Sequence, residues 1–573
     1  MNEGRRRPRG GGRMPTALER AVVAMQLGRP LVGRIVAVPG LCSYGQPRVI
    51  STYPVMWERP RSCMSGESGC ASPVCTTAPR PFPTLYWLTC PHLREAVSAL
   101  ESQGMIGEVM ERIERDEDFR GAHEVANMRY AGQRMALVSD EDWECLEREA
   151  PNMVRVLKET GVGGVASLSG VKCLHMHVAD SLAGNSNPVG DMTISRLEQA
   201  GARLECDRGR CVPARVGAVN AGSNSTKLLV ADVVPQPPVR AGTHLRQDAD
   251  GPWRLADMCR PPKVFRVKQD TRITGLGRGL EETGRLSGTG RTATVGAIRD
   301  FVGIGRTLGA DRIWVTATAA ARAAQNCQTL IGEVEEACGM RLEVISPKLE
   351  AELSFLGVLA CSGSASIMPD PARALVVDSG GMSTELTRMD SCSGGVECVS
   401  LPLGAVSLTD RFLLSDPPSQ NEVDRMREHI RAGLQEARAL VEGGAARAKG
   451  GSSGGGRCIP ASVVAVGGSA TTLASIGLKL DRFDPDLVHG RILSRDEVEA
   501  MFASLCALAY SERMQVRGMI QPERARVMPA GTAIILGVME LVGADSVTAS
   551  VAGILDGMAA CIGLGPGESG SRV

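Results

Sequence analysis

Three times in this 573-residue chain, an apolar run typical of a β-strand ends in a tight turn of glycine and small polar residues. The turns lie at 219–225, 376–385 and 466–473, and the third is followed by a helical pattern. Successive backbone N–H groups in such a turn can hold a phosphate, and a helix N-terminus favours an anion. One such turn is more often a plain β-turn, but three in one chain favour a phosphate-binding site.

The turns belong to a pattern in which strands and helices alternate. Strands are expected at 216–219, 227–233, 312–316, 341–345, 374–378 and 462–466, with helices between them at 292–308, 321–337 and 348–359. Ser419 followed by Glu422 is a capping-box pattern that predicts the start of another long helix. The alternation indicates an α/β fold.

Charge and apolar patterning exclude some classes of protein. Lys and Arg number 64, as do Asp and Glu, so the formal net charge is zero, which argues against a general nucleic-acid binder. No uncharged apolar run reaches the ~18 residues of a membrane span. The basic N-terminus lacks the apolar segment of a secretion signal, so we expect a cytoplasmic protein whose 18 cysteines are mostly reduced.

Further motifs accompany the turns in a fixed order: 317–322 with Asn326, Glu350-Ala351, 401–406, 488–490 and 522–525. Over about 214–560 this set resembles the exopolyphosphatase/guanosine-pentaphosphate phosphohydrolase (Ppx/GppA) family of the actin-like ATPase superfamily. The resemblance implies two actin-like (ribonuclease H-like) subdomains with a cleft between them. It also implies removal of the terminal phosphate of polyphosphate with the help of Mg²⁺ or Mn²⁺.

The resemblance also implies roles for particular residues. Glu350 is the expected base or water-orienting carboxylate, Arg322 the expected partner of phosphate oxygens, and Glu385 a further catalytic group that holds the metal with Asp378 and, through water, Asn220. The expected phosphate-binding residues are Gly222, Ser223, Asn224, Ser225, Gly380, Gly381, Ser383, Thr384, Gly468 and Ser469. From the residues alone, Glu350 would be read as a solvated carboxylate on a helix face, and Arg322 equally well as part of a surface ion pair.

Two departures from the family pattern bear on activity. Asn220 stands where the family usually has Asp, which removes a negative charge from the cation site, and Met382 replaces a third glycine. Three functions therefore stay open: an exopolyphosphatase, a guanosine pentaphosphate phosphohydrolase, and a catalytically weakened phosphate- or nucleotide-binding regulator. The expected partners are polyphosphate or guanosine pentaphosphate, not nucleic acid or membrane; a homodimer is left open.

The N-terminal part, at about 30–198, resembles a family called domain of unknown function 501, whose name carries no activity. The resemblance rests on 81–91, 161–175 and 187–190. Cys42, Cys90, Cys173 and His177 could form a closed zinc site, although their spacing matches no standard zinc motif. The alternative is that these cysteines are buried apolar thiols.

The predicted domains follow from these boundaries. They are a disordered basic tail at 1–28, a small α+β domain at 29–200, a linker at 201–213, subdomain I at 214–395, subdomain II at 396–562 and a flexible tail at 563–573.

Overall fold

The computed structural model describes residues 13–29, 31, 33–58, 78–206, 211–236, 261–361, 367–389, 396–441 and 460–564. The described chain divides into two compact units, with the main boundary between Pro213 and Ala214. We call them the N-terminal unit and the C-terminal unit.

The N-terminal unit combines a small antiparallel sheet with helices, an α+β arrangement. Its three-stranded sheet has the order β1-β2-β5 (Ile35–Leu41, Pro47–Thr52, Tyr86–Leu88), and β3 (Val55–Glu58) pairs with β4 (Ala78–Pro81). The helices are α1 (Ala17–Leu27), α2 (Pro91–Ser102), α3 (Met105–Arg115), α4 (Glu117–Leu137), α5 (Asp140–Glu149), α6 (Pro151–Glu159), α7 (Leu174–Leu182) and α8 (Pro188–Gln199). Apolar residues of α2, α3, α7 and α8 pack with Val49, Tyr86 and Leu88 of the sheet into one core.

The C-terminal unit contains a five-stranded and a six-stranded sheet that share the same topology over five strands. The first is β10-β9-β6-β7-β8 (Leu342–Val344, Arg312–Ala317, Ala214–Ala221, Ser225–Val234, Lys263–Ile273). The second is β13-β12-β11-β14-β16-β15 (Val396–Leu401, Thr384–Met389, Ala374–Ser379, Ser462–Val466, Ser546–Ala549, Ile492–Ser494). In each sheet, three consecutive strands form an antiparallel meander: β6-β7-β8 in the first and β11-β12-β13 in the second. The first strand of each meander also has a parallel neighbour, which is β9 beside β6 and β14 beside β11. The second sheet therefore repeats the topology of the first and adds β15 at its edge.

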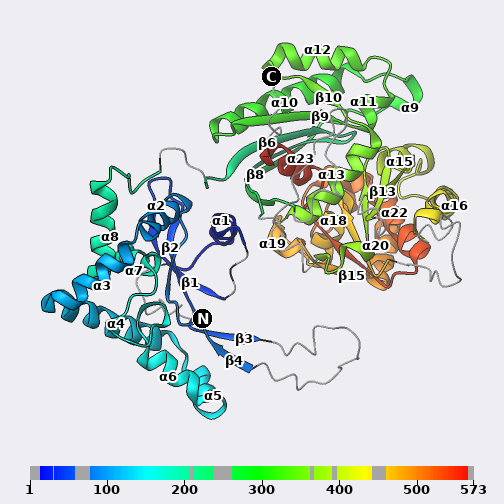
Figure 1. Ribbon diagram of the computed structural model, residues 1–573. Coiled ribbons are helices and arrows are strands. Elements are labelled where there is room, and N and C mark those ends of the chain that lie inside the picture. Colours follow the sequence, from blue (N-terminus) through cyan, green and yellow to red (C-terminus); the bar gives the residue numbers. More distant parts are fainter. Residues whose placement is uncertain are drawn as a thin grey trace, which may run out of the picture. The chain divides into compact units, whose positions relative to one another are not determined.

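Helices cover both faces of both sheets, as Figure 1 shows. On one face of the first sheet lie α10 (Gly288–Thr307) and α12 (Cys327–Cys338), and on the other lie α13 (Pro347–Ala360) and α23 (Ile554–Leu564). Phe355 and Val358 of α13 also pack on Val376 and Val464, so α13 lies between the two sheets. The far face of the second sheet is covered by α15 (Ala405–Phe412), α16 (Gln420–Leu434), α20 (Arg495–Ala507) and α22 (Met528–Val542). The remaining helices are α9 (Leu280–Thr283), α11 (Ala319–Ala323), α17 (Arg438–Val441), α18 (Gly467–Gly477), α19 (Pro485–Val488) and α21 (Tyr510–Arg513).

The predicted capping box is confirmed, because Ser419 accepts the backbone N–H of Glu422 at the start of α16. Two boundaries differ from the prediction. Residues 17–27 of the expected tail form α1, which buries Val22 and Val23. The second sheet already begins at 374, not 396, because β11 and β12 pair with β13 and β14, and α23 returns to pack on the first sheet. Residues 1–12 of the predicted tail 1–28 and residues 565–573 of the predicted tail 563–573 lie outside the described residues.

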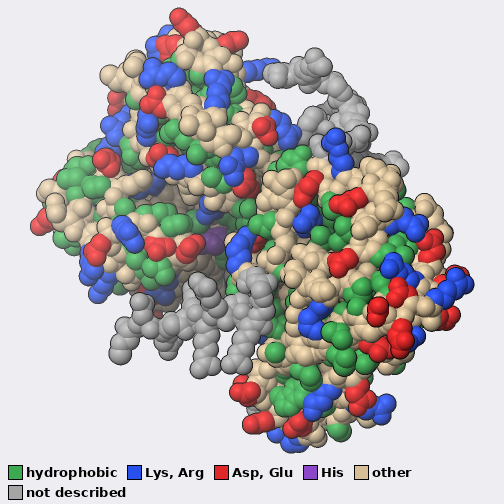
Figure 2. Space-filling model, turned by 90° about the vertical axis from the view of Figure 1, so that its left-hand side faces the viewer, with side chains coloured by type: hydrophobic (Ala, Val, Ile, Leu, Met, Phe, Trp, Pro, Cys, Tyr) green, Lys and Arg blue, Asp and Glu red, His purple; other side chains and the backbone are tan. Residues whose placement is uncertain are grey.

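The surface reflects the balanced charge. On the face seen in Figure 2, basic and acidic side chains are interspersed. Within the described parts of the chain, no helix is both long enough and apolar enough to cross a membrane.

Candidate active site

The first two glycine turns occupy equivalent places in the two sheets. Between β6 and β7, Asn220 lies opposite Lys227, and the Gly222 N–H donates to the Ser225 carbonyl at 3.0 Å. Between β11 and β12, Asp378 lies opposite Glu385, and the Gly380 N–H donates to the Ser383 carbonyl at 2.9 Å. The two turns are thus one hairpin geometry used twice.

These two turns face each other across the C-terminal unit. A Cβ added at Gly381 would lie 3.1 Å from Ser223 Cβ and 3.6 Å from the Asn224 nitrogen. A side chain at 381 would therefore be in tight contact with the opposite turn, which favours glycine at this position. Met382 is partly buried against the apolar cluster of the first sheet and also lines the cavity described next.

A cavity of about 590 Å³ opens between the turns. Most of the predicted phosphate-binding residues line it: Gly222, Ser223, Asn224, Ser225, Gly380, Gly381, Ser383, Gly468 and Ser469. Asn220, Glu350 and Asp378 line it too. Thr384, Glu385 and Arg322 are not among the lining residues; the Thr384 hydroxyl instead donates to the Leu403 carbonyl at 2.5 Å.

The third turn brings a helix N-terminus and a cation to the same cavity. Gly467, at φ +89°, joins β14 to α18, and a Cβ there would lie 3.1 Å from Asp378 Oδ1. A Cβ at Gly468 would lie 1.3 Å from Nη1 of Arg524, so the guanidinium occupies the space of the absent side chain. Burial lowers the pKa of Arg524 to about 10, which leaves it charged at neutral pH.

Glu350 lies in the first turn of α13 and reaches the cavity with one oxygen held by an arginine. Its Oε2 accepts a hydrogen bond from Arg322 Nη1 at 2.7 Å, and the same nitrogen donates to the Ile345 carbonyl at 2.9 Å. Burial raises the pKa of Glu350, and the positive charge of Arg322 works against that rise. Arg322 therefore contacts the carboxylate and not the cavity.

Two further carboxylates, those of Asp378 and Glu385, lie near Glu350. Asp378 accepts a hydrogen bond from Ser354 at 2.5 Å, and Glu385 accepts from Ser383 at 2.7 Å and Ser400 at 2.8 Å. Carboxylate and hydroxyl oxygens suit Mg²⁺ or Mn²⁺. The oxygens of Glu350, Asp378 and Glu385 do not all lie within 4.8 Å of one another, so these groups would hold an ion partly through water.

Glu385 should make the free energy of unfolding depend on pH, and a bound divalent cation should reduce this dependence. Burial, followed by the charges of Glu350 and Asp378, raises the pKa of Glu385 from 4.5 to about 8. Between these values the folded protein binds a proton that the unfolded chain has released, so the free energy of unfolding should fall as pH rises through the window. We expect a loss on the order of a few kcal/mol from pH ~5 to pH ~9 without divalent cations.

Thermal unfolding across pH, with EDTA or Mg²⁺, measures this effect. Glu385→Gln should flatten the pH dependence, and Mg²⁺ should restore stability of the wild type at the alkaline end. An equally steep dependence in Glu385→Gln would contradict the assignment.

Asn220 and Lys227 give the first sheet a different charge from the second. Asn220 accepts a hydrogen bond from the Thr316 hydroxyl at 3.0 Å, which leaves its amide N–H groups as donors. Lys227 lines the cavity with Arg524, and among the described residues neither makes an ion pair, although Arg524 Nε donates a hydrogen bond to Gln521 Oε1. Burial and the charge of Arg524 lower the pKa of Lys227. An anion in the cavity would satisfy both cations.

Lys227 and Arg524 are the site residues that the sequence analysis did not assign. The signal for Lys227 was a single cation immediately before the apolar run 228–231 of the same strand. Arg524 lies within the 522–525 motif, but the motif does not indicate whether Glu523 or Arg524 lines the cavity.

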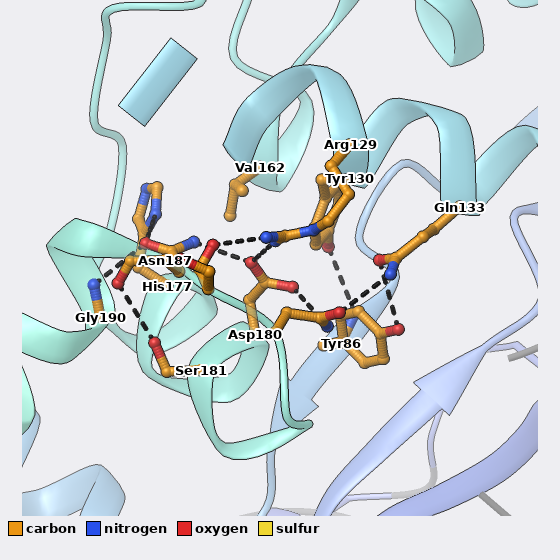
Figure 3. A network of polar contacts seen from close by, with 12 residues as sticks. Tyr86, Arg129, Tyr130, Gln133, Val162, His177, Asp180, Ser181, Asn187 and Gly190 are labelled. Atoms are coloured by element: carbon orange, nitrogen blue, oxygen red, sulfur yellow. Dashed lines mark hydrogen bonds and ion pairs between the residues drawn. The ribbon is translucent and has the colours of Figure 1, made fainter. Parts of the chain in front are cut away.

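The structure does not gather the predicted zinc ligands Cys42, Cys90, Cys173 and His177. Cys90 is buried near Cys42 and Cys206, and burial raises its pKa. His177 belongs to a different, buried network (Figure 3), in which its Nδ1 lies 3.2 Å from Asn187 Oδ1.

That network satisfies the buried Asp180 carboxylate. It accepts hydrogen bonds from Asn187 Nδ2 at 2.8 Å and Asn185 Nδ2 at 2.9 Å, and pairs with Arg129 (Figure 3). Burial lowers the pKa of His177 to about 3, so this imidazole is neutral. The four predicted ligands do not form one site, because Cys42 lies near Cys90, Cys173 contacts His175, and His177 contacts Asn187.

Comparisons with known proteins agree with this geometry. The profile of the Ppx/GppA phosphatase family matches residues 259–561, and that of a protein family of unknown function, DUF501, matches 38–195. Exopolyphosphatase 2 of Mycobacterium tuberculosis is 30% identical over 355 residues, which cover 60% of this chain and 97% of that protein. A guanosine-5'-triphosphate,3'-diphosphate pyrophosphatase of Vibrio vulnificus is 26% identical over 300 residues, 52% of this chain and 53% of that protein.

Among solved structures, an exopolyphosphatase-like protein superimposes with a TM-score of 0.50 at 28% identity, covering 61% of this chain and 98% of that one. The C-terminal unit thus has the actin-like ATPase fold, in a class of hydrolases that act on phosphoanhydride bonds. The chain belongs to the Ppx/GppA phosphatase family. Its N-terminal unit matches the DUF501 family in addition.

Proposed function

We propose that the C-terminal unit is an exopolyphosphatase that releases terminal orthophosphate from inorganic polyphosphate. The observation that supports this best is that both hairpin turns and Glu350 line one cavity, together with Lys227 and Arg524, which make no ion pair within the described part of the chain. Turn N–H groups can hold a terminal phosphate while the cations offset its charge.

In this proposal Glu350 acts on the attacking water. Phosphoryl transfer needs a positioned nucleophile and charge neutralisation more than covalent chemistry from the protein. Glu350 accepts the proton of a water molecule in line with the terminal phosphorus, and Arg322 holds the carboxylate in position and opposes the rise of its pKa that burial causes. Asp378 and Glu385 would hold a divalent cation, which would supply further neutralisation of phosphate oxygens.

Polyphosphate is the favoured substrate over guanosine pentaphosphate. The exopolyphosphatase relative is covered over 97% of its length, but the guanosine pyrophosphatase relative over only 53%. The test is phosphate release by the full chain from long-chain polyphosphate and from guanosine pentaphosphate, each with Mg²⁺ and with EDTA. We expect kcat/KM at least ~10-fold higher for polyphosphate. A preference for guanosine pentaphosphate would shift the proposal to that substrate, and no release from either would refute it.

A second candidate, a phosphate-binding regulator without turnover, is motivated by Asn220. An amide at 220 adds no negative charge to the cation site, unlike Asp378 in the equivalent position of the second sheet. If the wild type is inert, polyphosphate binding with a measurable Kd and a gain of hydrolysis in Asn220→Asp would support this candidate. Absence of both binding and hydrolysis would exclude it.

A further inference from the structure

In the N-terminal unit, a thiol, an imidazole and a carboxylate converge where α2 meets the start of α7. Cys173 Sγ lies 3.6 Å from His175 Nδ1, and the same Nδ1 lies 3.1 Å from Glu101 Oε1. One ligand atom from each residue lies within 4.8 Å of the other two, and no other such group of three occurs among the described residues. Nothing in the exopolyphosphatase proposal uses this cluster.

The second nitrogen of His175 indicates the tautomer. Nε2 lies 3.1 Å from the Arg94 carbonyl oxygen, which can only accept, so Nε2 carries the hydrogen. In a neutral imidazole Nδ1 then has a free lone pair, and this lone pair faces the thiol and carboxylate. A histidine that donates its distal N–H to a backbone carbonyl while its other nitrogen faces anionic ligands has the usual arrangement of a metal ligand.

The spacing also fits a particular ion. For tetrahedral Zn²⁺, bond lengths of ~2.3 Å to sulfur, ~2.05 Å to nitrogen and ~2.0 Å to oxygen place sulfur and nitrogen ~3.6 Å apart, and nitrogen and oxygen ~3.3 Å apart. The corresponding distances here are 3.6 and 3.1 Å. Thiolate and imidazole ligands favour zinc over Mg²⁺ or Ca²⁺, which prefer oxygen alone.

The ligands are held in place before any ion binds. Glu101 Oε1 accepts the Leu174 backbone N–H at 2.6 Å, which ties the carboxylate of α2 to the first turn of α7. Ser98, on the same side of α2 as Arg94, places its hydroxyl 3.1 Å from His175 Nε2. The side chains of His175 and Glu101 are 22% and 23% exposed, so solvent can reach the cluster and complete the coordination.

We propose that Glu101, Cys173 and His175 form a zinc site with three protein ligands and one open position for water. The competing occupant is a proton, which would make His175 an imidazolium between the thiol and the carboxylate. A zinc ion and a proton would both account for the observed distances, but only the zinc site predicts one bound metal ion per chain.

The test uses the full chain, with any affinity tag removed, stripped with EDTA and titrated with Zn²⁺ against a chromophoric chelator. We expect one tight site in the N-terminal unit, a Kd raised at least ~100-fold by Cys173→Ser and at least ~10-fold by Glu101→Gln. Co²⁺ in its place should give a sulfur-to-metal charge-transfer band that Cys173→Ser abolishes. Glu101→Gln keeps an acceptor for the Leu174 N–H, and circular dichroism checks that each variant folds.

Two controls locate the site. Cys145→Ser alters another thiol of the same unit, on α5, and Glu385→Gln alters a carboxylate of the C-terminal unit; both should leave the tight site intact. The proposal is overturned if folded wild type binds no Zn²⁺, or if Cys90→Ser abolishes binding while Cys173→Ser does not. A wild-type protein that remains metal-free and whose His175 titrates as an imidazolium by NMR would assign the cluster to the proton.

Discussion

Glu350→Gln should lower kcat for polyphosphate hydrolysis by ~10²–10⁴-fold and leave KM nearly unchanged. Glutamine can still accept the hydrogen bond from Arg322, so the local structure should persist, but it cannot take a proton from water. Since burial raises the pKa of Glu350, wild-type kcat should fall as this carboxylate protonates on the acid side. Steady-state phosphate release across pH measures both effects.

Glu352→Gln is the matched control for that experiment. Glu352 lies two residues further along α13 and contacts Lys348 at 3.9 Å, but it does not line the cavity. Its kcat should stay within about twofold of the wild type. The assignment of Glu350 fails if both variants retain wild-type turnover, or if Glu352→Gln is the more damaging of the two.

Arg524→Gln should lower kcat/KM for polyphosphate by ~10²-fold, mainly through a higher KM. The guanidinium fills the space beside Gly468 at the start of α18 and faces the cavity with Lys227. Its charge would contact phosphate in the ground state as well as in the transition state. The same charge also lowers the pKa of Lys227, so removing it should leave the melting temperature unchanged or higher.

Arg526→Gln provides the comparison for Arg524. Arg526 lies two residues after Arg524 in the same turn. Its side chain is exposed and forms an ion pair with Asp410 at 2.5 Å. Its kinetics should match those of the wild type, at most with a small loss of stability. Equal effects of the two substitutions would show that a general loss of positive charge, and not the placement of Arg524 in the cavity, is responsible.

Much of the C-terminal unit could be predicted from local patterns. The glycine turns, the strands that precede them and the capping box at Ser419 depend on neighbouring residues, and the structure contains them where they were expected. The subdomain boundary could not be found in this way. β11 and β12 join the second sheet through pairing with β13 and β14, and strand pairing is a long-range contact without a local signal.

In the candidate site, too, local properties could be predicted from the sequence and long-range contacts could not. The residue types of the turns and the acidic character of 350, 378 and 385 are local properties, and the sequence by itself determined them. Only the tertiary structure decided that Gly381 would approach Ser223, that Arg322 would hold Glu350, and that Lys227 and Arg524 would share one cavity. It also separated Cys173 from the other predicted zinc ligands and placed it beside Glu101 and His175. The physical reason is that backbone conformation follows from adjacent residues, whereas the partner of a charged side chain depends on how distant segments pack.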